Sequence, residues 1–176
     1  MPLPTIATPT YELELPSTGK KIKYRPFLVK EEKLLVLALE TEDTKQISTA
    51  IKTVLKNCIQ TRGVKVENLP TFDIEYLFLN IRGKSVGEEI EVNLIAPDDE
   101  ETSVPVTINI DDIKISKKKG HTNKIKLDKS LVMEMKYPSL DEFVKNNFDF
   151  DGEVNMDQSF DLIASCIDKI YNEEEV

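Results

Sequence analysis

An acidic stretch near the carboxyl end holds the residues best suited to chemistry. Residues 147 to 158 read Asn-Phe-Asp-Phe-Asp-Gly-Glu-Val-Asn-Met-Asp-Gln, and oxygen-bearing side chains at alternate positions beside a glycine are typical of a calcium-binding loop between two helices. The ligands of such a loop would be Asp149, Asp151 and Glu153. Its last position, however, is Gln158, where a bidentate glutamate should stand. We therefore predict an acidic linker that binds no metal, with Asn155 capping the helix that follows.

The sequence contains one histidine and two cysteines, and these low numbers restrict the catalytic and zinc sites that it could form. His121 follows a run of lysines and a glycine, which is typical of an exposed loop rather than of a buried general base. Cys58 and Cys166 are far apart in the sequence, so we expect two buried free thiols and no zinc site. Phosphate loops, dinucleotide glycine patterns and Cys-x-x-Cys pairs are absent from the sequence.

These patterns predict a protein that is not an enzyme, with no catalytic, cofactor-binding or metal-binding residues and no cofactor. A hydrolase that uses scattered carboxylates is the outside alternative, but no pair of acids marks a recognisable site.

Charge is distributed unevenly along the 176 residues. Residues 1–66 carry 11 Lys/Arg and 7 Asp/Glu, a net charge of +4, whereas residues 137–176 carry 2 Lys/Arg and 11 Asp/Glu, a net charge of −9. An acidic carboxyl-terminal arm argues against nucleic acid as the main partner. The longest apolar run, 34–39, is too short to cross a bilayer. We expect protein partners, no nucleic acid and no membrane.

Apolar periodicity predicts a β-hairpin followed by three helices. The hairpin joins strands near 11–15 and 22–27 through a Pro-Ser-Thr-Gly turn. The helices are expected at 30–39, at 44–59 after an Asp43–Gln46 capping pattern, and from 72 onward with Thr71 as cap. The third helix is apolar on most sides, which predicts that it is buried. The residues expected in its core are Phe72, Tyr76, Leu77 and Ile81.

The second half alternates between strands and helices. Apolar residues at every second position predict paired antiparallel strands near 90–94 and 104–110, and a short strand at 132–137. Ser139 and Glu142 form a capping box for a short helix, and a last helix is expected from about 155 to 171. The fold class is therefore α+β: an N-terminal β-hairpin, a helical core, antiparallel strands in the middle and a helical C-terminal arm. We divide the chain into a body, 1–136, and an acidic arm, 137–176.

Four stretches in a fixed order resemble one known family. They are Pro9–Lys20 leading into Ile22–Phe27, the helix beginning Lys30–Leu35, the segment Phe72–Gly87, and His121–Ile125 with Met135–Pro138. Together they resemble the baseplate hub and tail-assembly proteins of T-even-like bacteriophages. The resemblance implies a non-enzymatic structural or assembly protein of a contractile-tail baseplate hub, with other hub proteins or the tape-measure protein as partners. The alternative is a tail-assembly chaperone that is absent from the mature virion.

The same resemblance implies assembly in the host cytoplasm, and a place in the tail baseplate if the protein stays in the particle. For partner binding we single out apolar residues of the expected last helix: Phe160, Ile163, Ile167, Ile170 and Tyr171. This stripe either packs on the protein's own core or binds a partner or a second copy. A polar linker before it favours the second role, in which case removing residues 155–176 should abolish association and leave the body folded.

Overall fold

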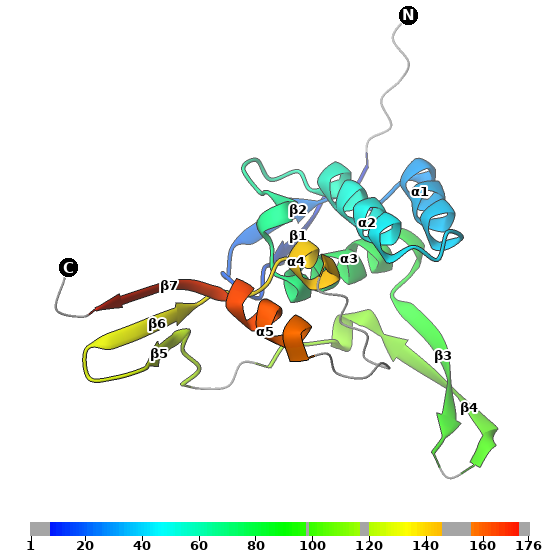
Figure 1. The fold of residues 1–176 in the computed structure, drawn as a ribbon. Helices are drawn as coiled ribbons and strands as arrows, with labels where there is room; N and C mark the ends of the chain where they lie inside the picture. The colour runs from blue at the N-terminus through cyan, green and yellow to red at the C-terminus, as the bar shows by residue number, and fades with distance from the viewer. Residues whose placement is uncertain (1–7, 98, 117–119, 146–155, 173–176) are drawn as a thin grey trace, which may run out of the picture.

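The computed structural model describes residues 8–97, 99–116, 120–145 and 156–172, and its helices and antiparallel strands confirm the α+β class (Figure 1). The strands form three separate sheets, β1-β2, β3-β4 and β5-β6-β7. In chain order the described elements are β1 (Tyr11–Glu14), β2 (Lys21–Tyr24), α1 (Val29–Leu39), α2 (Thr44–Cys58), the 3-10 turn η1 (Val66–Asn68), α3 (Thr71–Val86), β3 (Glu89–Ala96), β4 (Asp99–Asn109), the 3-10 turn η2 (Ile110–Asp112), β5 (Lys124–Lys126), β6 (Leu131–Met135), α4 (Leu140–Lys145), α5 (Met156–Ser165) and β7 (Ile167–Asn172).

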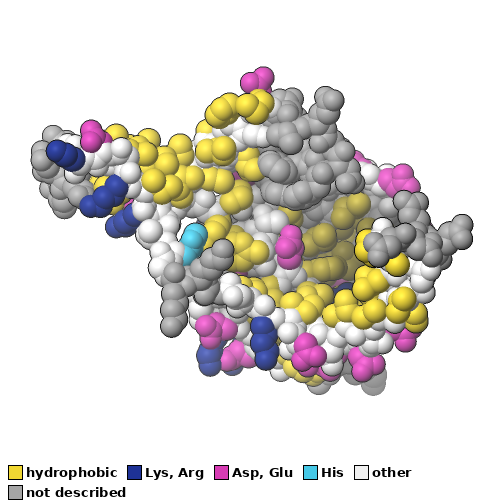
Figure 2. Space-filling model, turned by 90° about the horizontal axis from the view of Figure 1, so that it is seen from below, with side chains coloured by type: hydrophobic (Ala, Val, Ile, Leu, Met, Phe, Trp, Pro, Cys, Tyr) yellow, Lys and Arg dark blue, Asp and Glu magenta, His cyan; other side chains and the backbone are white. Residues whose placement is uncertain are grey.

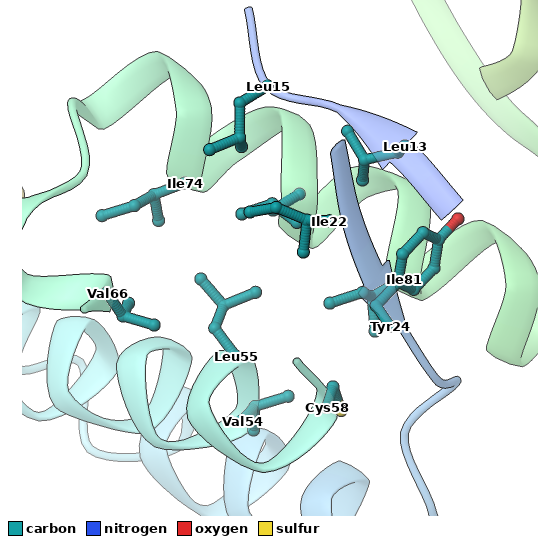
Figure 3. Close-up of a cluster of buried hydrophobic side chains, with 11 residues drawn as sticks. Leu13, Leu15, Ile22, Tyr24, Val54, Leu55, Cys58, Val66, Ile74 and Ile81 are labelled. Atoms are coloured by element: carbon teal, nitrogen blue, oxygen red, sulfur yellow. The ribbon is translucent and has the colours of Figure 1, made fainter. Parts of the chain in front are cut away.

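The core lies where the first hairpin packs against α2 and α3 (Figure 3). In the hairpin, Leu13 faces Ile22 across the ladder, and both side chains are buried because alternate residues of a strand point to the same face. The buried members of the cluster are Leu13, Leu15, Ile22, Tyr24, Val54, Leu55, Cys58, Val66, Ile74, Leu77 and Ile81. The predicted hairpin and the second helix are thus confirmed.

Helix α3 lies in the centre of the core, as predicted, but the residue at its N-terminal cap position is not the predicted Thr71. Leu77 and Ile81 are fully buried, and Tyr76 is half-buried at the edge of the cluster. Phe72 is half-buried outside the cluster, where its ring packs edge-on against Tyr137, so the prediction that Phe72 is a core residue is wrong. Pro70 occupies the cap position, and the Thr71 hydroxyl lies inside the first turn, where it finds no partner among the described residues. The helix is tied to the hairpin turn instead by buried Asp73, whose carboxylate accepts bonds from the Ser17 N–H (3.0 Å) and the Ser17 hydroxyl.

A largely buried ion pair joins the residue that follows β2 to α1. The Arg25 guanidinium Nη2 lies 3.0 Å from Glu31 Oε1, and the other carboxylate oxygen accepts the Leu28 N–H at 2.8 Å. Burial of Glu31 opposes its ionisation, but these hydrogen bonds outweigh that effect, so the pKa of this carboxyl is held below its ordinary value. The pair sets the corner at which the chain turns into α1.

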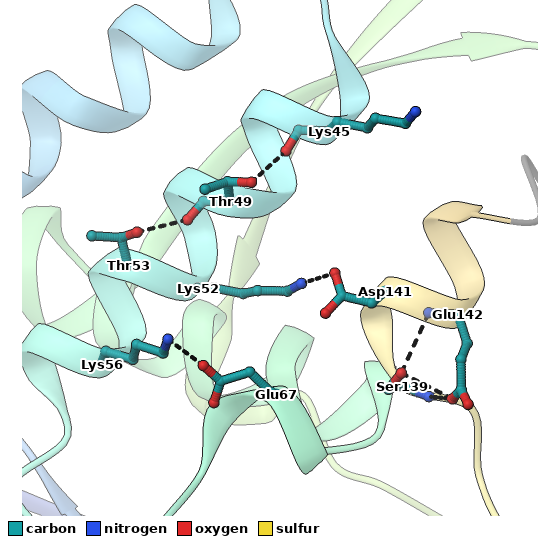
Figure 4. A network of polar contacts seen from close by, with 9 residues as sticks. All are labelled: Lys45, Thr49, Lys52, Thr53, Lys56, Glu67, Ser139, Asp141 and Glu142. Carbon is teal, nitrogen blue, oxygen red and sulfur yellow. Dashed lines mark hydrogen bonds and ion pairs between the residues drawn. The ribbon is translucent and has the colours of Figure 1, made fainter.

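Helix α4 packs on α2 and α3, and Figure 4 draws its contact with Lys52 of α2 and its own capping bonds. The Ser139–Glu142 capping box is confirmed, because the Ser139 N–H donates to Glu142 Oε2 at 2.7 Å and the Glu142 N–H donates back to Ser139 Oγ at 3.3 Å. Asp141 pairs with Lys52 of α2. The division after residue 136 stays a prediction, although α4 contacts helices that precede this boundary.

The predicted extent of the last helix is wrong. Helix α5 ends at Ser165, and residues 167–172 form β7, which pairs antiparallel with β6. The turn between them is made by Cys166, whose carbonyl accepts the Lys136 N–H at 2.7 Å. β-branched Ile167 and Ile170 fit a ladder better than a helix, so pairing with β6 overrides the helical spacing of the apolar residues.

Candidate partner-binding surfaces

The histidine does not take part in a nucleophilic triad. His121 is exposed, and its Nε2 lies 3.4 Å from the Tyr137 hydroxyl at the edge of a hollow of about 510 Å³ that Ser17 also lines. In a triad the imidazole stands between the serine and the acid. Here the Ser17 hydroxyl donates directly to Asp73, so the arrangement serves the hairpin turn rather than acyl transfer.

Metal ligands are not gathered within the part of the chain that the structure describes. No group of three or more His, Cys, Asp or Glu side chains there could hold an ion. The acidic stretch that resembles a calcium loop lies at 147–158, and its residues up to 155 fall outside the described ranges. The buried carboxylates of the described residues, Glu31 and Asp73, are both bound in structural contacts.

The cysteines occupy different environments. Cys58 is buried in the core, and this burial raises the pKa of its thiol to about 11, which keeps it protonated and unreactive at neutral pH. Cys166 is half-buried in the turn between α5 and β7, which corrects the expectation of two buried thiols.

The five predicted partner-binding residues lie on two elements instead of one helix. Phe160 and Ile163 belong to α5 and are 64% and 56% exposed, and Ile170 of β7 is 52% exposed. Ile167 and Tyr171, also on β7, are half-buried. Met156 at the start of α5 is exposed as well and was not predicted. We call α5 and β7 together the C-terminal surface.

A second apolar surface, on α1, was missed by the sequence reasoning. Of this helix only Glu31 and Ala38 are buried, while most of its large apolar side chains are exposed. Apolar hollows lie along both sides of the helix, of about 410 Å³ toward the first half of α2 and about 380 Å³ toward α2 and α3. The signal was present in the sequence, since an unbroken apolar run at 34–39 cannot all face one side of a helix.

The hollow between α1, α2 and α3 also contains a guanidinium group. Arg82 of α3 lines it, and its Nη1 atom is buried without a hydrogen-bond partner among the described residues. Glu32 of α1 lines the same hollow, but its side chain is exposed and no ion pair joins it to Arg82 in the described structure.

A third apolar surface is one face of the β3–β4 ribbon, which projects away from the helices in Figure 1. Its cross-strand pairs are Ile90 with Ile108, Val92 with Val106 and Leu94 with Val104. Pairs directly opposite in an antiparallel ladder share a face, so these six side chains form one apolar stripe. Its outer end is exposed, because Leu94 and Val104 have no covering element.

From below, Figure 2 shows apolar side chains gathered both along a projecting arm and in the middle of that face, with Lys and Arg side chains at the end of the arm. Within the described residues no helix is both long and apolar enough to cross a membrane. Exposed apolar groups on three sides of a small protein are typical of a subunit that binds other proteins.

No curated protein and no solved structure matches this chain. A family model, described as T4 bacteriophage base plate protein, matches residues 8–176. The match covers nearly the whole chain and includes the four stretches on which the resemblance rested, so the chain belongs to the T4 bacteriophage base plate protein family.

Proposed function

We propose that the protein is a non-enzymatic structural or assembly component of the baseplate hub, and that it acts by binding another hub protein or the tape-measure protein. Membership of a baseplate family supports a structural role in the phage tail. The observation that carries the binding role is the C-terminal surface, where Phe160, Ile163 and Ile170 are more than half exposed.

Exposure of the apolar C-terminal surface to water is energetically unfavourable. A partner that covers this surface therefore gains binding free energy. Burying a large apolar side chain that was exposed contributes about 1.5–3 kcal/mol, so three such residues can anchor a stable contact. The arm that holds them carries the net charge of −9, which favours a partner with a basic face and makes association faster at low ionic strength.

The test is capture of a named partner by a tagged protein from infected cells. The wild type should retain a hub or tape-measure polypeptide, identified by mass spectrometry, and the F160S/I163S variant should lose it. These substitutions lie on α5 and leave the β6–β7 ladder intact, unlike a deletion of residues 155–176, which would remove β7. Ile95→Ser, at an equally exposed site near the ribbon tip, is the matched control. Equal capture by wild type and F160S/I163S would refute the role of the C-terminal surface.

A tail-assembly chaperone is the second candidate, and the several open apolar surfaces favour it. A permanent subunit should bury such surfaces inside the particle, whereas a chaperone exposes them to clients and then leaves. The two roles place the protein differently, in the virion tail or only in the host cytoplasm during assembly. Quantitative mass spectrometry of purified particles and of infected-cell lysate distinguishes them, because a hub subunit is present in both and a chaperone only in the lysate.

A further inference from the structure

The β3–β4 ribbon is a two-stranded sheet, so each strand has an outer edge that pairs with no other strand of the described structure. In Figure 1 the ribbon projects away from the helices, where another chain can reach it. A two-stranded ribbon is only marginally stable in water, and an unpaired edge is a template for a further strand. Which of the two edges can pair follows from the direction of their backbone groups.

One hydrogen bond fixes the direction in which the backbone groups of the ribbon point. The Ile110 N–H donates to the Glu88 carbonyl at 2.8 Å, directly next to the ladder pair of Glu89 with Asn109. In an antiparallel ladder, pairs that exchange hydrogen bonds alternate with pairs that do not. Even-numbered residues between 89 and 95 and between 103 and 109 therefore bond across the ribbon, and odd-numbered residues direct their N–H and C=O groups to the outer edges.

The outer edge of β4 is blocked by a proline. Pro105 is odd-numbered, so its nitrogen faces outward, where it has no N–H to donate and its ring obstructs an approaching strand. Proline at such a position is one way in which natural proteins prevent pairing at an edge strand. The outward-facing residues of β3 include no proline: they are Glu89, Glu91, Asn93 and Ile95. The outer edge of β3 is therefore the one at which a further strand can add.

The sequence of β3 is complementary to itself in one antiparallel register. When Val92 lies opposite Val92 of a second copy, each outward-facing residue gains a hydrogen-bonded partner, because Glu89 meets Ile95 and Glu91 meets Asn93. In the same register Ile90 meets Leu94, so apolar side chains lie opposite apolar side chains. A register with Glu91 opposite Glu91 would bring like charges together, which destabilises a strand pair.

We propose that two copies of this protein pair through the outer edges of β3, antiparallel about Val92, and form a four-stranded sheet in the order β4-β3-β3-β4. The apolar stripes of the two ribbons then lie on one face of this sheet. Both copies use the same edge, so the contact is isologous and closes as a dimer. The edges that remain are those of β4, which Pro105 blocks. This inference goes beyond the proposed function, which concerns the C-terminal surface and a different protein.

The first experiment is sedimentation velocity on the purified full-length protein over a range of concentration. The wild type should pass from the 20.0 kDa monomer to a dimer and no further. Asn93→Pro should weaken the dimer at least about tenfold, because the donor is lost from both copies. This substitution removes no bond of the β3–β4 ladder, since the Asn93 N–H faces outward and the residue opposite it is Pro105.

Two matched variants separate the edge from the substitution. Asn93→Thr keeps the outward N–H, and Thr107→Pro places a proline at an outward position of β4 instead of β3. Both should dimerise as the wild type does. An Asn93→Pro protein that is folded by circular dichroism and dimerises as strongly as wild type would overturn the inference, and so would loss of the dimer in Thr107→Pro alone.

Disulfide formation tests the register without a proline. Directly opposite residues that exchange no hydrogen bonds have Cα atoms about 4.5 Å apart, which suits a disulfide. In a background without the half-buried Cys166, V92C/C166S should therefore form a disulfide-linked dimer under mild oxidation. V106C/C166S is the control, because Val106 lies on the same stripe but on β4, roughly 14 Å from its counterpart across three strand spacings. Equal cross-linking of the two variants would overturn the register.

The dimer and the proposed function can fail separately. F160S/I163S alters α5 and should dimerise as the wild type does, whether or not it captures a hub protein; loss of its dimer would assign self-association to the C-terminal surface and overturn the inference. A wild type that stays monomeric would also overturn it. If such a monomer bound a hub or tape-measure protein and Asn93→Pro abolished that binding, the β3 edge would accept a foreign strand and not a second copy.

Discussion

The buried pair between Arg25 and Glu31 should contribute strongly to stability, and Glu31→Ala tests it. The Glu31 side chain is 1% exposed and that of Arg25 is 14% exposed, with 3.0 Å between Nη2 and Oε1. Removing Glu31 leaves a guanidinium with little water around it, and also takes the acceptor away from the Leu28 N–H at the start of α1.

The expected loss in the free energy of unfolding follows from this geometry. Breaking a buried ion pair by deleting one partner costs roughly 3–5 kcal/mol, because the remaining charge is uncompensated. Arg25 keeps some exposure and also donates to the Pro26 carbonyl at 2.8 Å, so we expect the lower end, about 3 kcal/mol. Glu31→Gln should lose less, since an amide oxygen can still accept the Leu28 N–H.

The pair should also make stability depend on pH. The pKa of Glu31 is lowered from its ordinary value of 4.5, so its contribution is fully present above that value and is lost as pH falls through the lower folded-state pKa. The difference in stability between wild type and Glu31→Gln should therefore be constant near neutral pH and shrink below about pH 4.5.

Urea denaturation followed by circular dichroism measures these differences. The matched control is Glu12→Gln, which breaks the exposed pair with Lys21, where the side chains are 44% and 71% exposed. An exposed pair contributes at most about 1 kcal/mol, so the urea midpoint should hardly move. Equal midpoints for Glu31→Ala and Glu12→Gln, or a gap between wild type and Glu31→Gln that widens in acid, would refute the reasoning.

Three further predictions concern the core, the hairpin turn and the thiols. Leu77→Ala should cost about 3–5 kcal/mol in urea unfolding, and Tyr76→Ala clearly less, because Tyr76 is half-buried; the opposite order would place the core elsewhere. Asp73→Asn should destabilise the protein by about 1–3 kcal/mol and speed amide exchange at the hairpin turn, because Ser17 loses its carboxylate acceptor; unchanged exchange would contradict this. A thiol reagent at neutral pH should label Cys166 well before Cys58, as peptide mapping would show, and the reverse order would contradict the burial of Cys58.

Much of the first half of the fold could be predicted because its signals are local. The hairpin follows from alternation at residues 11–15 and its return strand, and α2 follows from i, i+3, i+4 spacing after Asp43, whose carboxylate accepts the Lys45 N–H at 2.8 Å. The Ser139–Glu142 box likewise acts within one turn of chain. Residues a few positions apart determine these features, so no knowledge of distant neighbours is needed.

The candidate surfaces could not be predicted in the same way, because tertiary contacts decide which residues form them. Residues 167–172 have apolar spacing that suits a helix and β-branched residues that suit a strand, and only pairing with β6 decided between them. The groove beside α1 likewise exists because three helices and the β2–α1 connection meet there, and the sequence shows only that the 34–39 run has more apolar residues than one face can bury. The sequence by itself determined the class of fold, the periodic elements and the family resemblance. The tertiary structure decided which apolar residues remain exposed, because burial depends on which distant segments pack together.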